Sequence, residues 1–126
     1  DFFNLRAMSL FFSLDGIDSY VSQLIQFIMK TIYTTEIFDG WFDSLKDKQV
    51  ARRIQARIDR AEEGNFGDHK SVGESVSEMR IHHGPGFRVY FTQRGLEIVI
   101  LLAGGDKSSQ TKDIQTAQEL ARQLKE

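Results

Sequence analysis

The most informative segment of the chain is Arg80-Ile81-His82-His83-Gly84-Pro85-Gly86-Phe87-Arg88-Val89-Tyr90-Phe91. It predicts a β-hairpin, because a cluster of Gly and Pro between two runs of alternating apolar residues is typical of a turn between strands. Side chains alternate between the two faces of a strand, so the apolar sets of both strands share a face only if the loop has an odd number of residues. We therefore predict a three-residue loop, Gly84–Gly86, which pairs Ile81 with Val89.

The same register places polar side chains on the other face of the hairpin. Arg80 would lie across from Tyr90, and His82 would lie across from Arg88. An arginine presents a planar fork of donors to phosphate oxygens, and histidine is the side chain that titrates near neutral pH. This face is therefore predicted to bind a phosphate and to transfer a proton.

The composition is that of one globular domain. The chain has 126 residues, of which 40% are apolar and 27% are charged, enough for one core but not for two. It has no cysteine, which excludes disulfides and thiolate metal sites and favours a reducing cytoplasm. The histidines lack the spacing of a metal site, so we expect neither a metal nor a cofactor. The net charge of −2 excludes a globally basic nucleic-acid coat, although residues 80–112 hold five Lys/Arg against two acids.

The order of elements from residue 30 onward predicts an α+β fold. Thr35 and Asp47 are expected to cap two helices, the second of which ends at Gly64, and residues 65–73 are expected to form a polar loop. Hydrophobic periodicity predicts strands at 30–34, about 74–83, 87–93 and 96–103. It also predicts a last helix from about 111 to 125.

The run Ile98-Val99-Ile100-Leu101-Leu102 is apolar on both faces, so we expect it to be the central strand, ending at Gly104-Gly105. The predicted fold class is a small antiparallel sheet with helices packed on one face. The opposite face would then carry the polar side chains of the hairpin.

Residues 1–28 have a different character. Five apolar side chains recur at helical spacing, and they predict an amphipathic helix over residues 17–28: Ile17, Val21, Leu24, Ile25 and Ile28. No run reaches the ~20 apolar residues of a membrane span, and the features of a signal peptide are missing, so we expect no membrane partner. Met29 looks like a natural translation start, so residues 1–28 are either an upstream-encoded extension or a part of the functional unit at 29–126. The apolar stripe predicts self-association into a homodimer.

Two segments resemble a known family. The hairpin at residues 80–90 and the run Leu102-Ala103-Gly104-Gly105-Asp106-Lys107-Ser108-Ser109-Gln110, taken with the order of elements, resemble the RelE/ParE toxin superfamily, and within it the HigB-like addiction module killer proteins. The resemblance covers about residues 29–126. It implies the toxin of a type II toxin–antitoxin module, neutralised by a cognate helix-turn-helix antitoxin. In the RelE and HigB relatives it further implies ribosome-dependent cleavage of mRNA, which inhibits translation.

The resemblance also implies catalytic residues. Arg80, Arg88 and Tyr90 match the strand positions where these toxins hold catalytic residues, and Lys107 lies in a motif that recurs in this branch. Metal-independent RNA cleavage needs a base for the 2′-hydroxyl, cations for the phosphate and an acid for the leaving oxygen, so His82 is added to this set. Tyr90 could exchange a proton if neighbouring cations lower its pKa.

The identity of the general base stays open at this point. The lysine pair that RelE carries before its conserved arginine is missing here, and Glu74 and Glu78 occupy that strand instead. Lys70 is the nearest substitute. The predicted RNA-phosphate contacts are Arg53, Arg57, Lys70 and Lys112. The helical spacing of the two arginines is most often that of a solvated helix face.

Two other functions remain open for this fold. A ParE-like protein would inhibit DNA gyrase by binding, without catalysis. A pure binding module derived from the fold would have no toxicity. A proton-transfer partner on the face of Arg80 and Arg88 would favour the endoribonuclease over both.

Overall fold

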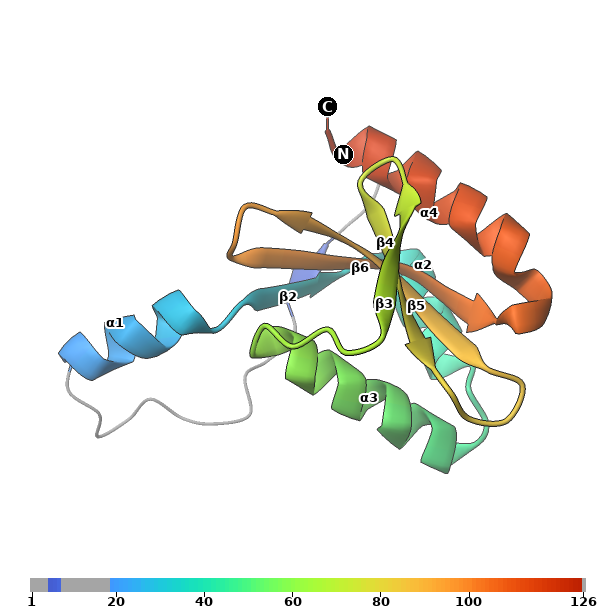
Figure 1. Cartoon of the computed structure of the whole chain (residues 1–126), viewed down its shortest axis with the longest axis horizontal. Helices are drawn as coiled ribbons and strands as arrows, with labels where there is room; N and C mark the ends of the chain where they lie inside the picture. Colours follow the sequence, from blue (N-terminus) through green and yellow to red (C-terminus); the bar gives the residue numbers. More distant parts are fainter. Residues whose placement is uncertain (1–4, 8–18, 126) are drawn as a thin grey trace.

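The computed structural model describes residues 5–7 and 19–125, and it confirms the α+β class. The elements run, in chain order, β1 (Arg6–Ala7), α1 (Ser19–Ile28), β2 (Thr31–Thr34), α2 (Glu36–Asp43), α3 (Lys48–Glu62), β3 (His69–Gly73), β4 (Val76–Ile81), β5 (Phe87–Arg94), β6 (Ile98–Asp106), the short 3-10 helix η1 (Lys107–Ser109) and α4 (Gln110–Leu124). The strands form one sheet in the order β1-β2-β6-β5-β4-β3 (Figure 1). The strand β2 runs parallel to β6, and the other neighbours are antiparallel.

The predicted helix caps are confirmed. The Thr35 hydroxyl accepts a hydrogen bond from the Phe38 amide at 3.0 Å and donates one to the Leu102 carbonyl at 2.7 Å, so one side chain both begins α2 and anchors it to β6. The Asp47 carboxylate accepts from the amides of Gln49 and Val50 and begins α3. Such caps satisfy amides that have no partner within the helix.

The helices cover both faces of the sheet, not one as predicted. The helices α2 and α3 pack on the face that holds Val89, Val99 and Leu101. The helix α4 packs on the opposite face, over Tyr90, Ile100 and Leu102 (Figure 1). Because β5 and β6 are apolar on both faces in their middle, each face needs a cover. The central position of β6 is confirmed by its pairing with β2 and β5.

The strand β6 continues through the two glycines that were expected to end it, as far as Asp106. A Cβ at position 104 would collide with the indole ring of Trp41, and one at position 105 would collide with the Asp113 carboxylate. Glycine is therefore needed here for close packing of α2 and α4 on the strand, and not for a turn.

The hairpin of β4 and β5 has the predicted faces but a different register. Its loop spans five residues, 82–86, so that Arg80 pairs with Arg88, Ile81 with Phe87, and Glu78 with Tyr90. The odd loop length keeps every side chain on its predicted face, as a shift of two residues must. The wider loop is closed by hydrogen bonds within it, including one from the Gly86 amide to the His83 carbonyl at 3.0 Å.

The strand β3 lies where a loop was predicted. It forms a hairpin with β4 whose two turn residues, Glu74 and Ser75, both have positive φ, 59° and 63°. A two-residue turn of this kind favours Asn-Gly, and its usual sequence signal is missing here.

The N-terminal residues that the structure describes include a strand and the predicted helix. The strand β1 pairs with β2, with Arg6 opposite Thr34. The helix α1 projects beyond the start of β2 (Figure 1), and Leu24 and Ile28 are 46% and 66% exposed. Ile17 of the predicted stripe lies outside the described residues. Self-association through this stripe stays a prediction. Among the described residues, no helix has the length and hydropathy to span a membrane.

Candidate functional site

A row of polar residues crosses the sheet at one end of β4. Asp68 lies directly before β3, and its carbonyl accepts a hydrogen bond of 2.9 Å from the Arg80 amide, which extends the β3–β4 pairing by one residue. On the other side Arg80 pairs with Arg88, and Arg88 pairs with Gly105 of β6. Residues paired across strands share a face, so these side chains lie on the face that α4 partly covers.

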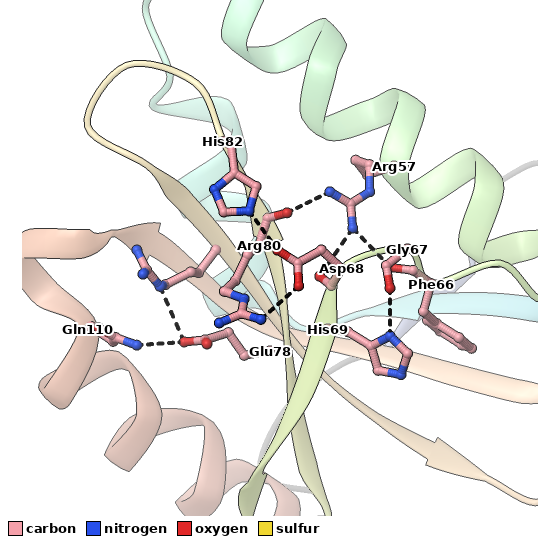
Figure 2. Close-up of polar contacts among 10 residues, drawn as sticks. Arg57, Phe66, Gly67, Asp68, His69, Glu78, Arg80, His82 and Gln110 are labelled. Carbon is pink, nitrogen blue, oxygen red and sulfur yellow. Dashed lines mark hydrogen bonds and ion pairs between the residues drawn. The ribbon is translucent and has the colours of Figure 1, made fainter.

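The Asp68 carboxylate binds two of the predicted site residues. Its Oδ1 accepts from Arg80 Nη2 at 2.7 Å, and its Oδ2 lies 2.6 Å from His82 Nε2 (Figure 2). The hydrogen bonds from His82 and Arg80 hold the pKa of Asp68 below its usual value. The His82 side chain is 77% exposed and that of Arg80 is 32% exposed, so both remain accessible to a ligand.

Arg57 fixes the segment that carries Asp68. From α3, its Nη1 donates to the Arg80 carbonyl at 2.6 Å, and its Nη2 donates to the carbonyls of Phe66 and Asp68 at 2.9 and 3.3 Å (Figure 2). A Cβ at Gly67, whose φ is +61°, would press on the guanidinium. Arg57 was predicted to bind RNA phosphate; in this structure its donors bind backbone carbonyls, which indicates a positioning role.

Arg88 lies deeper than the other cations. Its Nε is 3.3 Å from Glu78 Oε1, and the two side chains are 14% and 0% exposed. The same carboxylate oxygen accepts from Gln110 Nε2 at 2.8 Å (Figure 2). Arg88 is thus held by a buried acid between β4, β5 and the start of α4.

Tyr90 does not fit the predicted proton transfer. It is 0% exposed beneath α4, and its hydroxyl has no hydrogen-bond partner in the described part of the chain. Burial raises its pKa, and the nearby carboxylates of Glu78 and Asp113 raise it further. The condition set for proton transfer, a pKa lowered by neighbouring cations, is not met, because the burial of the phenol and the two carboxylates outweigh the lowering effect of Arg88.

The remaining predicted residues are exposed and spread around this row. Lys70 is on β3 and pairs with Glu78, so it shares a face with Arg80. Lys107 begins η1, and its amide binds the Gly86 carbonyl beside the hairpin loop at 3.0 Å. Lys112 lies in the first turn of α4, and Arg53 lies on α3 one turn before Arg57. The structure therefore gathers Arg80, His82, Arg88 and Lys70 on one face, with Lys107 at its edge.

A family model identifies the family of the chain. Residues 40–126, more than half of the chain, match the family described as "Phage derived protein Gp49-like (DUF891)". The chain belongs to this Gp49-like family. It is a toxin-like family of addiction modules, which confirms the expectation at that level and leaves the RelE/ParE branch a prediction.

A relative shows that most of the chain recurs elsewhere. An uncharacterized protein of Haemophilus influenzae (strain ATCC 51907 / DSM 11121 / KW20 / Rd) is 50% identical over 93 residues, which cover 74% of this Gp49-like chain and 94% of that protein. No solved structure matches the chain.

Three residues of this candidate site did not appear among the sequence-predicted ones: Asp68, Glu78 as a buried partner, and Gln110. Asp68 was placed inside a loop, where an acid is most often solvated. Its signal would have been the second hairpin, because pairing β3 with β4 puts Asp68 opposite Arg80. Because the turn lacks the Asn-Gly signal, the sequence did not predict this hairpin.

Proposed function

We propose that this Gp49-like protein is the toxin of a type II toxin–antitoxin module and that it cleaves mRNA on the ribosome. The observation that carries the proposal is the exposed His82 side chain beside Arg80, on the sheet face that also holds Arg88. An imidazole next to guanidinium groups can supply both the base and the fixed positive charge that metal-independent cleavage of a phosphodiester uses. A binding-only inhibitor of DNA gyrase has no need of such a pair.

The reaction is a transesterification within the RNA strand. A base takes the proton of the 2′-hydroxyl, and the 2′-oxygen forms a bond to phosphorus. The bond from phosphorus to the 5′-oxygen then breaks, and that oxygen takes a proton from the solvent. The products are a 2′,3′-cyclic phosphate and a 5′-hydroxyl. Arg80 supplies fixed positive charge to the phosphate as negative charge builds up in the transition state, and Lys107 and Lys70 add charge at the edge.

The proposal also gives the buried cation a role. Arg88 is 14% exposed, so it would stabilise the phosphate mainly through its electrostatic field. The Nη groups, which Glu78 does not bind, add to this stabilisation. Lys112 and Arg53 are exposed and are assigned to the backbone of mRNA or ribosomal RNA. The antitoxin is expected to be a small helix-turn-helix protein.

The test uses purified protein with ribosomes translating a defined mRNA. Primer extension should give new 5′ ends inside codons with the wild type. Arg80→Ala should cleave on the order of 10²-fold more slowly. Lys46→Ala, which removes an exposed charge between α2 and α3, is the matched control and should cleave like the wild type.

A parallel assay of DNA gyrase tests the alternative function, a ParE-like inhibitor. Supercoiling of a relaxed plasmid by DNA gyrase should be unaffected by the wild-type protein. Intact transcripts together with inhibited supercoiling would replace the endoribonuclease with a ParE-like inhibitor. If the protein neither cleaves transcripts nor inhibits supercoiling, and its expression leaves cell growth unchanged, the result would favour a binding module without toxicity.

A further inference from the structure

We infer that Asp68 is the positioning residue that makes His82 the general base of the proposed cleavage, with Nδ1 as the atom that takes the 2′-hydroxyl proton. This inference rests on the proposed function. It assigns the base, which the sequence left open, and it gives a role to a residue that no sequence pattern singled out.

The hydrogen bond between the two side chains fixes the tautomer. An ionised carboxylate has no proton to donate, so the 2.6 Å contact between Asp68 Oδ2 and His82 Nε2 requires that Nε2 carry the hydrogen. In the neutral ring the lone pair is then on Nδ1, the only ring nitrogen that can accept a proton. The carboxylate also stabilises the imidazolium once it forms, because the proton and the charge lie close together.

Asp68 is itself held from several sides. Its Oδ1 binds Arg80 Nη2, its carbonyl accepts from the Arg80 amide, and the same carbonyl accepts from Arg57 Nη2. A carboxylate tied at both oxygens and at its backbone loses little further freedom when His82 becomes charged. Because one carboxylate binds both His82 and Arg80, it fixes the distance between the proton acceptor and the cation that meets the phosphate (Figure 2).

If Asp68 only stabilised the fold, it would make the same contacts. The test therefore needs readouts that a purely structural role would not affect. The first is the rate of mRNA cleavage on ribosomes in a double-mutant cycle. His82→Ala should slow cleavage on the order of 10²-fold or more, and Asp68→Asn should slow it about 10-fold or more, since the amide can donate to Nε2 and favour the wrong tautomer. In the His82→Ala background, Asp68→Asn should change the rate by less than about twofold.

The second readout is spectroscopic and needs no activity. The ¹⁵N shifts of the His82 ring, measured at a pH where the ring is neutral, should show a hydrogen on Nε2 in the wild type. Asp68→Asn should shift the ring toward the other tautomer, while Asp43→Asn, an exposed acid at the end of α2, should leave it unchanged.

The outcomes separate this inference from the proposed function. If the wild type cleaves but Asp68→Asn slows cleavage equally with and without the His82 side chain, Asp68 acts through Arg80 or through the fold, and the inference is overturned. A neutral His82 with its hydrogen on Nδ1 in the wild type overturns it as well. If the wild type cleaves no mRNA, the proposed function fails, and the spectrum shows by itself whether the pair exists.

Discussion

Glu78 Oε1 lies 3.3 Å from Arg88 Nε, and this ion pair is nearly closed to solvent, with 0% and 14% of the two side chains exposed. The carboxylate belongs to β4 and the guanidinium to β5, and Gln110 ties the same oxygen to α4. The other carboxylate oxygen, Oε2, has no hydrogen-bond partner among the described residues. The stability of the fold should therefore depend on the charge of Arg88 more than on that of Arg80, whose ion pair with Asp68 is partly exposed.

Arg88→Ala should destabilise the protein by about 3–5 kcal/mol, because it leaves the Glu78 charge buried and unpaired. The double variant Glu78→Gln/Arg88→Met should lose much less, since it removes both charges and keeps the volume. Arg80→Ala breaks a partly exposed pair and should cost about 1 kcal/mol or less. Urea unfolding of the purified variants measures all three. Equal losses for Arg80→Ala and Arg88→Ala would contradict the burial of this pair.

Tyr90→Phe should leave cleavage within about twofold of the wild type and raise the free energy of unfolding by up to about 1 kcal/mol. The reason is that the hydroxyl is buried without a partner, so removing it relieves a desolvation penalty. Cleavage and urea unfolding are measured on the same preparation. A well-folded variant that no longer cleaves would show that α4 leaves Tyr90 during the reaction.

Asp68 should make stability depend on pH in the acid range. His82 and Arg80 lower its folded pKa below the unfolded value of about 3.9. The unfolded chain therefore binds more protons at this position, so the stabilisation is complete above about pH 3.9 and is lost as the pH falls through the folded pKa. The urea midpoint of the wild type should fall more steeply there than that of Asp68→Asn. Parallel curves for the two proteins would rule out the contribution, and Asp43→Asn is expected to follow the wild type.

Two glycines should respond to alanine in opposite directions. Gly104→Ala drives a Cβ into the Trp41 ring and should destabilise the protein by about 1–3 kcal/mol or more. Gly40→Ala, inside α2 where a Cβ meets open space, should stabilise it by about 0.5–1 kcal/mol. Thermal unfolding of both variants is the measurement. A tolerated Gly104→Ala would mean that α2 can shift away from β6.

Features that act over a few residues could be predicted from the amino-acid sequence. The caps at Thr35 and Asp47, the apolar stripe of α3 and the odd length of the hairpin loop are local, because each depends on neighbours within a turn or on the two-residue period of a strand. These features were enough to predict the α+β class and to place Arg80, His82 and Arg88 on one face.

The way distant segments meet depends on tertiary contacts, which local patterns do not specify. The two-residue shift of the hairpin, the pairing of β3 with β4 and the cover of Tyr90 by α4 all depend on backbone hydrogen bonds and burial between segments whose local patterns allow more than one arrangement. Asp68 is 12 and 14 positions from Arg80 and His82 in the sequence, and no periodicity links residues across a turn whose type is not written in its residues. Folding brings them to hydrogen-bond distance because strand pairing fixes the neighbours of Arg80.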